Sequence, residues 1–318
     1  MTSSDGNGNT PKNSNVADNS NTPNNANSSS EHNLSNAYIT KNSTGNIVTK
    51  STENNYHNIP AYLLTSIDSQ GIATVTLNRT QVHNAFDDVM ISQLLTTFTT
   101  LKEDPRVRAL ILRSRGKHFS AGADLNWMQE IAQQTYQQNL ADAGLLAQLM
   151  SALNLFPRPT IALVHGAAFG SAVGLIACCD IALATTQACF CLSEVKIGLI
   201  PAVISPYVVA AIGQRQARRY CLTGEKFNAQ QALTYGLVHQ LCDDLDQGVK
   251  PYIHAILANS PAATQAAKAL IQDVTNQPIN PPLIADTSQR IAAIRVSSEG
   301  QEGLSALLQK RKPHWAKE

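Results

Sequence analysis

The sequence predicts an α/β domain with parallel strand pairs, preceded by a polar tail. Short apolar runs at residues 107–113, 160–164 and 180–185 alternate with segments of helical periodicity. Strands that alternate with helices are typical of a sheet whose strands run parallel. The 318 residues suffice for one large domain or two small ones. A formal net charge of +1 argues against a dedicated nucleic-acid binder, which normally carries a basic excess.

The first sixty residues differ in composition from the rest, with 16 Asn and almost no large apolar side chains. Such a segment buries too little apolar area to offset the entropy of ordering, so we expect residues 1–58 to form a disordered Asn/Ser-rich tail. It lacks the apolar block of a secretory signal and the Arg residues of a mitochondrial presequence. The six Cys form no C-x-x-C pair. We therefore expect a cytoplasmic protein with buried thiols and no metal site.

The residues after the tail predict a regular order of elements. Residues 62–67 and 72–77 are β-branched and alternate, and the turn between them predicts a hairpin. Asp87 is placed to cap a helix that runs to about Lys102. The further elements expected are a strand over 107–113, a helix over 138–154, a strand over 160–164, a helix over 171–178, strands over 180–185 and near 238–241, and helices over 282–297 and 300–310.

Residues 159–179 carry no charged side chain and contain Gly166, Gly170 and Gly174, a spacing that imitates a transmembrane helix-dimer motif. The apolar run at 160–164 is only long enough for a strand, and the glycines that follow interrupt it. We therefore interpret the stretch as a strand, a turn and a short buried helix, and expect no membrane association.

Two Gly-rich loops, residues 119–124 and 165–172, each follow a buried strand directly. Ligands of open α/β sheets bind beyond the carboxyl ends of the strands. Two backbone amides that converge from such loops would form an oxyanion hole for the enolate of a thioester. Tight packing alone would also explain small residues here. A P-loop, a G-x-G-x-x-G fingerprint, a nucleophile elbow and an H-E-x-x-H motif are all missing from the sequence.

From about Tyr62 to Trp315 the chain resembles the crotonase family, the enoyl-CoA hydratases and isomerases. The segments that carry the resemblance are 72–78 with 83–85, 119–125, 179–182, 192–201, 222–225, 232–238 and 302–313. The resemblance implies a crotonase-like spiral of ββα units over 59–258 and a helical C-terminal region over 259–318. It also implies an acyl-CoA substrate, no separate cofactor because coenzyme A is part of that substrate, and a homotrimer or a dimer of trimers.

The resemblance also implies the catalytic groups. The oxyanion amides would belong to Ala123 and Ser171, and Glu194 matches the later of two glutamates that hold a water in typical hydratases. The earlier glutamate is replaced by Gly174. Glu194 could then take a proton from the water that attacks the enoyl thioester, or shuttle a proton between carbons as an isomerase. Alternatively, Glu194 has a structural role, as a helix cap or as a carboxylate that pairs with Lys196.

Further residues are expected to contact the substrate. Lys312 and Trp315 could hold a CoA phosphate and stack on adenine across a subunit boundary, or form a solvated helix end. Trp127 could wall the acyl pocket or belong to the core. The residues expected to bind substrate are Asn84, Ala85, Ala121, Asp124, Trp127, Gly170, Lys312 and Trp315.

Within the family, residues 189–206 and 295–303 resemble the bacterial methylglutaconyl-CoA hydratases of leucine breakdown. This implies an acyl group with a distal carboxylate and a cation close to it, for which Lys196 is a candidate; a solvated lysine is the alternative. An enoyl-CoA isomerase is the second enzyme hypothesis. A binding protein without turnover and an RNA-binding protein are further classes, and the near-neutral charge argues against the last.

Overall fold

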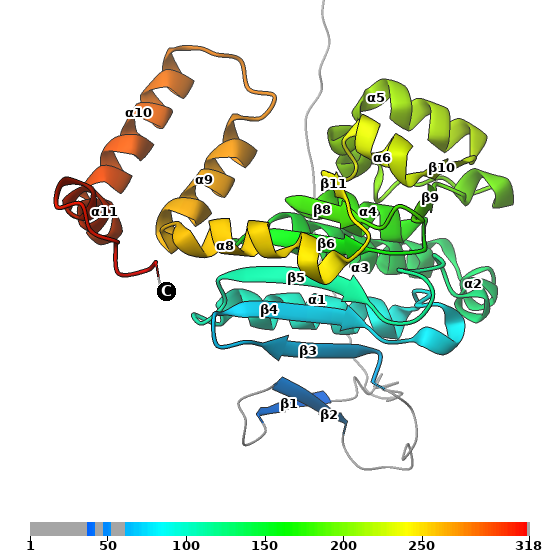
Figure 1. The fold of residues 1–318 in the computed structure, drawn as a ribbon. Coiled ribbons are helices and arrows are strands. Elements are labelled where there is room, and N and C mark those ends of the chain that lie inside the picture. The colour runs from blue at the N-terminus through cyan, green and yellow to red at the C-terminus, as the bar shows by residue number, and fades with distance from the viewer. Residues whose placement is uncertain (1–36, 42–46, 52–60, 317–318) are drawn as a thin grey trace, which may run out of the picture. The chain divides into compact units, whose positions relative to one another are not determined.

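The computed structural model describes residues 37–41, 47–51 and 61–316, and it contains helices, a large sheet and two small ones (Figure 1). The large sheet has six strands in the order β11-β8-β6-β5-β4-β3. Only β3 and β4 pair antiparallel in it, as the predicted hairpin, and every other neighbouring pair is parallel. Its strands are β3 (Leu63–Ile67), β4 (Ile72–Leu77), β5 (Ala109–Ser114), β6 (Thr160–Val164), β8 (Ile181–Ala184) and β11 (Gln240–Leu241).

The helices in the described part of the chain are α1 (Asp88–Glu103), α2 (Leu125–Ile131), α3 (Tyr136–Asn154), α4 (Ser171–Cys178), α5 (Ser205–Thr223), α6 (Ala229–Tyr235), α7 (Leu245–Gly248), α8 (Lys250–Ala258), α9 (Pro261–Val274), α10 (Pro281–Val296) and α11 (Ser298–Leu308). Helix α1 confirms the predicted cap, because the Asp87 carboxylate accepts a hydrogen bond from the Met90 N–H at 2.8 Å. The helices near 138–154 and 171–178 are confirmed as α3 and α4.

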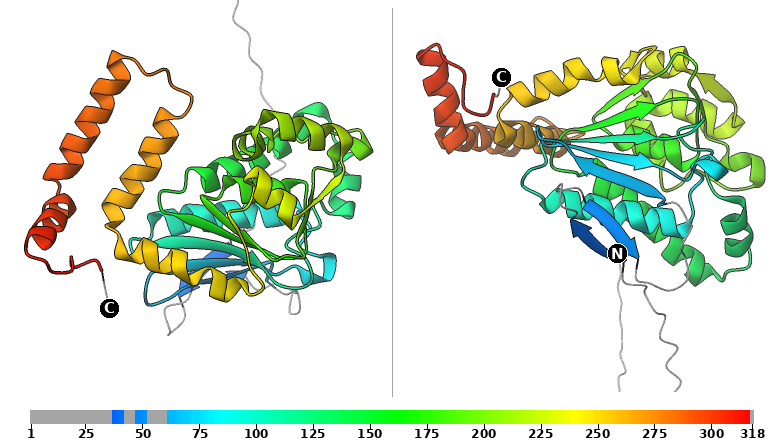
Figure 2. Two further views of the ribbon diagram at one scale, coloured as in Figure 1. Left: turned by 45° about the horizontal axis from the view of Figure 1, so that its top comes forward. Right: turned by 60° about the horizontal axis from the view of Figure 1, so that its bottom comes forward.

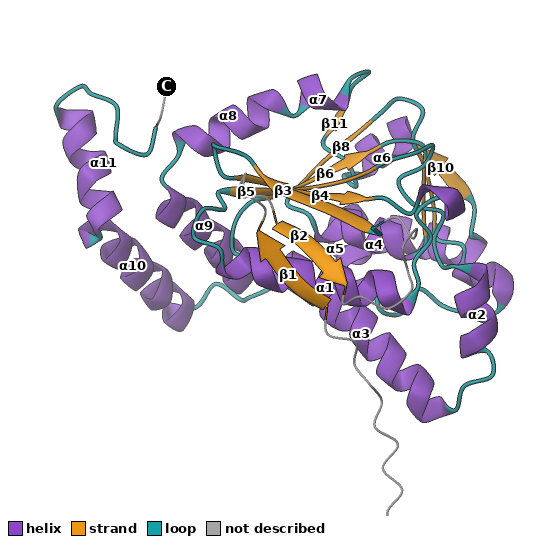
Figure 3. Cartoon of the chain, turned by 90° about the horizontal axis from the view of Figure 1, so that it is seen from below, coloured by secondary structure: helices purple, strands orange, loops and turns teal. Residues whose placement is uncertain are grey.

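Both faces of the large sheet are covered, which is why its strands are nearly continuous apolar runs. In β5, Leu110 and Leu112 belong to the larger core cluster, which α1, α3, α4 and α5 complete. Ala109 and Ile111 point to the opposite face and belong to a smaller cluster with α7 and α8. Figure 3 shows α7 and α8 on one side of the strands and α1 and α3 on the other. The sheet is thereby fixed, and the loops at its strand ends have a rigid base.

A second sheet of three short strands was not expected from the sequence. Its order is β10-β9-β7, with β7 at Ala167–Phe169, β9 at Cys189–Cys191 and β10 at Lys226–Asn228. Strand β9 pairs parallel with β7 and antiparallel with β10. Each strand has only three residues, too short for an alternating pattern to stand out. This sheet supports the second Gly-rich loop.

The C-terminal helices α9 and α10 contain no buried residue, and α11 buries only Ala306. Their apolar side chains include Ile284, Ile291, Leu304 and Leu307, all of which are exposed in the single chain. These helices therefore do not cover the core of their own chain. Figure 2 shows α9, α10 and α11 extending away from the large sheet.

The expectation of a tail without regular structure over 1–58 fails for ten of its residues. Strands β1 (Ala37–Lys41) and β2 (Ile47–Ser51) pair antiparallel. Both segments contain β-branched or aromatic residue types that favour strands, which the Asn-rich average concealed. The rest of that predicted tail lies outside the described residues. No helix in the described ranges is long and apolar enough to cross a membrane, and residues 160–178 form β6, β7 and α4.

Candidate active site

The first Gly-rich loop connects β5 to α2 and is held on both sides by backbone hydrogen bonds. Ser120 bonds to β7, because its N–H donates to the Ala167 carbonyl at 3.0 Å and its carbonyl accepts from the Phe169 N–H at 3.1 Å. The Asp124 N–H donates to the Phe86 carbonyl at 2.8 Å. Between these fixed points, the N–H of the exposed Ala123 donates to no atom of the described residues. One backbone donor is therefore left free in a rigid loop.

The second Gly-rich loop leads from β7 into α4. Gly170 has φ 56° and ψ −124°, a conformation that favours glycine, and its N–H donates to the Cys191 carbonyl at 2.9 Å. Ser171 is the first residue of α4, so its N–H has no partner within the helix. No other acceptor in the described ranges takes this N–H. The positive end of the helix dipole lies at the same point.

The two loops touch at a pair of glycines. A Cβ atom built on Gly170 would lie 4.0 Å from Cα of Gly122, and one built on Gly122 would lie 3.3 Å from the Phe169 carbonyl oxygen. Both glycines have a positive φ, 96° at Gly122 and 56° at Gly170, a conformation that favours glycine. Ala123 and Ser171, which carry the free N–H groups, each follow one of these glycines directly.

Glu194 lies beside this glycine contact. It opens a short 3-10 helix, Glu194–Ile197, just after β9, and its Oε1 is 3.4 Å from a Cβ built on Gly170. Its Oε2 is buried and has no hydrogen-bond partner among the described residues. Burial raises the pKa of the Glu194 carboxyl, against a smaller opposing effect of its own backbone N–H. A buried carboxylate oxygen without a partner costs stability, which is the mark of a group kept for chemistry.

Gly174 is buried on α4 and has no room for a side chain. A Cβ there would lie 2.3 Å from Cγ2 of Ile204 and 3.3 Å from Sδ of Met150. Ile204 therefore occupies the space that a second glutamate would need. Glu194 has no partner carboxylate from this position.

Filling this position is expected to destabilise the protein. Gly174→Ala should lower the free energy of unfolding by about 1–3 kcal/mol, because the methyl group overlaps Ile204. Gly144→Ala in α3 is the matched control, since nothing lies within 4 Å of a Cβ there. That control should be neutral or stabilising by up to about 1 kcal/mol. Urea unfolding of both variants measures the difference, and equal effects would contradict the packing of Ile204 against Gly174.

A family model for enoyl-CoA hydratase/isomerase matches residues 68–318. The chain belongs to this family. A crystal structure of an enoyl-CoA hydratase from Shewanella pealeana is 53% identical, with a TM-score of 0.79 over 80% of this chain and 96% of that one. The 2,3-dehydroadipyl-CoA hydratase of Escherichia coli is 31% identical over 77% of this chain and 94% of its own length. The trans-2-decenoyl-acyl-carrier-protein isomerase of Streptococcus mutans is 33% identical over 57% of this chain and 69% of its own length.

These similarities confirm the crotonase-like fold that the resemblance implied. They include both hydratases and an isomerase, so family membership does not choose between the two reactions.

Two polar residues of this enoyl-CoA hydratase/isomerase family member were expected to contact substrate but are engaged inside the protein. Asn84 is fully buried, and its Nδ2 donates to the carbonyls of Arg115 at 2.8 Å and His118 at 3.0 Å. Asp124 caps α2 and forms an ion pair with Arg79 at 2.7 Å. The side chains of Asn84 and Asp124 therefore hold the loops in place.

The smaller expected residues lie around the two loops. Ala85 is buried, and its carbonyl accepts a hydrogen bond from Nη1 of Arg79 at 2.8 Å. Ala121 is exposed on the first loop, and Trp127 is half-buried against the main core cluster. Of these, Ala121 is accessible to a ligand in the single chain.

Lys312 and Trp315 lie elsewhere in the chain. The Trp315 indole N–H donates to the Ala258 carbonyl at 3.2 Å, and its ring packs on Gly303 of α11. Figure 1 shows α11 on the opposite side of the large sheet from α2. One chain therefore does not bring these residues to the Gly122–Gly170 contact.

Arg79, which joins two helix caps, was not among the residues expected from the sequence. Its guanidinium pairs with Asp87 of α1 at 2.9 Å and with Asp124 of α2 at 2.7 Å, and it lies over the ring of Tyr62. All three charged side chains are largely buried. Asp87 follows Arg79 by 8 residues and Asp124 follows it by 45, so the signal in the sequence was limited to two Asp residues that each precede a helix. This cluster fixes the entry of α2, directly after Ala123.

Proposed function

We propose that this chain hydrates enoyl-CoA thioesters, with Glu194 as the base and the N–H groups of Ala123 and Ser171 as the oxyanion donors. The observation that carries the proposal is the buried, unpaired Oε2 of Glu194 beside the contact between Gly122 and Gly170. A partnerless carboxylate next to two free backbone donors suits proton transfer at a carbon adjacent to a thioester carbonyl.

In this mechanism the thioester carbonyl oxygen accepts hydrogen bonds from both N–H groups. Glu194 removes a proton from a water as the water oxygen bonds to Cβ, and the electron pair of the double bond moves through Cα onto the carbonyl oxygen. The enolate then collapses, and Cα takes a proton from the Glu194 carboxyl or from solvent. The helix dipole of α4 favours the negative charge at its first N–H.

A second candidate is an enoyl-CoA isomerase. Ile204 packs against Gly174 and leaves no room for a second carboxylate there, and an isomerase needs only one. With one carboxylate, Glu194 can take a proton from one carbon and return it to another while the same donors hold the dienolate. The S. mutans relative is named as an isomerase of a thioester-linked acyl chain.

One experiment separates the two reactions. The protein is incubated with a conjugated enoyl-CoA, and the thioester absorbance is followed together with the product mass. Hydration removes the conjugated absorbance and adds the mass of one water. An unchanged mass with a shifted double bond would replace the hydratase proposal by the isomerase one, and no reaction with any enoyl-CoA would favour a binding role.

For the substrate, we propose an acyl group with a distal carboxylate, such as 3-methylglutaconyl-CoA of leucine breakdown. The sequence resemblance over residues 189–206 supports this substrate. The E. coli relative is named for dehydroadipyl-CoA, whose acyl chain also ends in a carboxyl group. A higher kcat/KM for a carboxyl-bearing enoyl-CoA than for crotonyl-CoA would support this assignment.

We further propose that the chain acts as a homotrimer or a dimer of trimers. The exposed apolar side chains of α10 and α11 would then be covered by a neighbouring chain. In such an assembly Lys312 and Trp315 would reach the CoA of an adjacent subunit. Sedimentation velocity measures the state, and a monomer at micromolar concentration would contradict it.

The rate is expected to depend on pH through Glu194. A general base must be deprotonated, so kcat/KM should fall as pH is lowered through the pKa of this carboxyl. Because burial raises that pKa, the fall should begin at a higher pH than for an exposed glutamate. Crotonyl-CoA has no titrating acyl group, so its pH profile reports on the enzyme. A profile that is flat down to the usual range of an exposed glutamate would contradict a raised pKa.

A further inference from the structure

Three residues form one row across the small sheet, next to the proposed catalytic groups. In the strand register, Cys191 of β9 pairs with Phe169 of β7 on one side and with Lys226 of β10 on the other. Directly paired residues on adjacent strands share a face of the sheet. Ser171 follows Phe169 by two residues and Glu194 follows Cys191 by three. Two residues of this row are therefore close in sequence to the proposed catalytic groups.

The ammonium group of Lys226 reaches across this row. Its Nζ lies 5.3 Å from the centre of the Phe169 ring, two strands away. Burial raises the pKa of the Cys191 thiol, Lys196 and Lys226 oppose that shift, and Glu194 adds to it. The Cys191 thiol itself is buried and donates to the Gly224 carbonyl at 3.2 Å.

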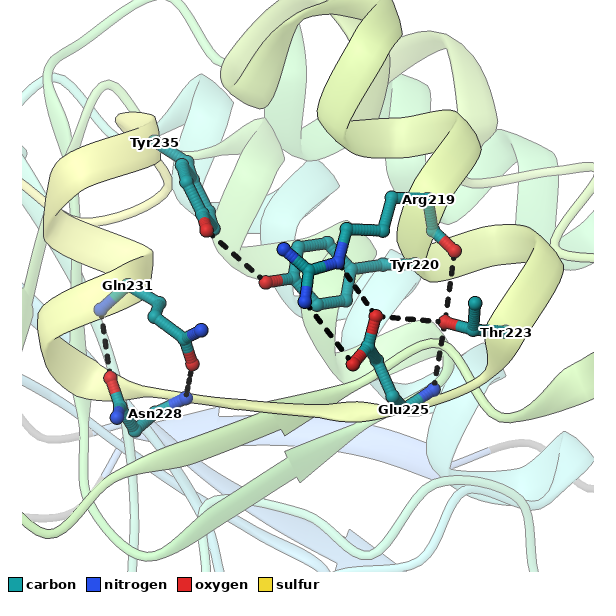
Figure 4. Close-up of polar contacts among 7 residues, drawn as sticks. All are labelled: Arg219, Tyr220, Thr223, Glu225, Asn228, Gln231 and Tyr235. Carbon is teal, nitrogen blue, oxygen red and sulfur yellow. Dashed lines mark hydrogen bonds and ion pairs between the residues drawn. The ribbon is translucent and has the colours of Figure 1, made fainter.

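The backbone of β10 is held firmly at both ends, which fixes the position of Lys226. Glu225 forms an ion pair with Arg219 at 2.7 Å and accepts a hydrogen bond from the Thr223 hydroxyl (Figure 4). Asn228 and Gln231 form a reciprocal capping box at the start of α6. Lys226 lies between these two anchored points.

Lys226 has no acidic partner among residues 61–316. Other cations of the described residues are paired, among them Arg79 with Asp87 and Asp124, Arg219 with Glu225, and Lys268 with Asp180. The Phe169 ring gives the Lys226 ammonium a weak cation–π contact but no counter-charge. Because the Lys226 ammonium is exposed and has no ion-pair partner among these residues, it is suited to bind an anionic group of a ligand.

We propose that Lys226 is the specificity-determining residue that binds the distal carboxylate of the acyl chain. This inference rests on the proposed function, because the acyl chain must lie between the oxyanion donors and Glu194. In this proposal the far end of a short acyl group reaches past the Phe169 ring to the Lys226 ammonium, which lies 5.3 Å from the centre of that ring. Lys196 is the other nearby cation, but its side chain lies along Gly224, with Cε 3.0 Å from a Cβ built there. Lys196, the candidate in the sequence, is the competing cation, and the test below separates it from Lys226.

The test measures binding, so that it does not depend on turnover. Calorimetry gives the Kd of glutaryl-CoA, which has a distal carboxylate, and of pentanoyl-CoA, which has the same chain length without one. We expect the wild-type protein to prefer glutaryl-CoA, and Lys226→Gln to weaken glutaryl-CoA binding about tenfold while leaving pentanoyl-CoA unchanged. Lys226→Arg should keep most of the preference, and Lys196→Gln, the matched control, should keep all of it.

The results separate this inference from the proposed function. A preference that survives Lys226→Gln, or that Lys196→Gln alone removes, overturns the role of Lys226. Equal binding of the two ligands by the wild-type protein overturns it as well. A protein that shows the expected binding pattern but does not hydrate any enoyl-CoA keeps the Lys226 assignment and loses the hydratase proposal.

Discussion

Glu194→Gln is expected to lower the rate of enoyl-CoA hydration by about 10²–10⁴-fold, the usual contribution of a general base. The amide has the shape of the carboxylate but does not accept a proton from water. KM should change little, because Oε2 of Glu194 has no partner in the structure and touches only the reacting groups in the proposed mechanism. Steady-state kinetics with crotonyl-CoA measures both parameters.

We expect Glu194→Gln not to lower the stability of the folded protein. Burial raises the pKa of Glu194, so its charged form costs free energy in the folded protein at neutral pH. A neutral amide removes that cost, and the melting temperature of Glu194→Gln should equal or exceed that of the wild type. Glu103→Gln at the exposed end of α1 serves as the control and should keep full activity. A Glu194→Gln protein of normal stability and normal rate would show that Glu194 is not the base.

Ser171→Pro is expected to lower the rate by about 10²–10³-fold, the cost of losing one oxyanion donor. Proline removes the backbone N–H at position 171 and places its ring Cδ where the hydrogen was, so the carbonyl oxygen loses this donor and the space beside it. Proline suits the first turn of a helix, where the N–H has no helical partner, so α4 should form as before. The loss should appear in kcat, because the hydrogen bond strengthens as charge develops on the carbonyl oxygen.

Ser171→Ala is the matched control for this prediction. It removes the hydroxyl and keeps the N–H, so its rate should stay within a few-fold of the wild type. Circular dichroism and thermal melting establish whether the proline variant keeps its fold. A folded Ser171→Pro protein with the kcat of Ser171→Ala would exclude this N–H as an oxyanion donor.

The large sheet and its helices could be predicted from the sequence because their signals are local. Asp87 precedes an apolar periodic segment and a stop at Pro105, and both ends of α1 follow from these residues. The strand at 160–164 is a β-branched apolar run between turn residues, and the structure has it at the same residues. Such elements can be predicted from the side chains of their own residues, without knowledge of what they pack against.

The small sheet could not be predicted in this way, because its strands are defined by pairing between distant segments. Cys191 pairs with Phe169 and Lys226, which lie 22 and 35 residues away along the chain. For the same reason the sequence suggested Lys196, which is near Glu194 in the chain, and not Lys226, which the strand register pairs with Cys191. Asp124 was expected to bind substrate, and its ion pair with Arg79 depends on a contact that no local pattern reports.

We propose that Ala123 and Ser171 hold one carbonyl oxygen next to Glu194, and a crystal structure of the protein with a saturated acyl-CoA would test this arrangement. We expect a thioester oxygen about 2.7–3.1 Å from both backbone nitrogens, with the Glu194 carboxylate facing the carbon β to the carbonyl. A thioester oxygen bound by other groups, or N–H groups of Ala123 and Ser171 that point apart, would contradict it.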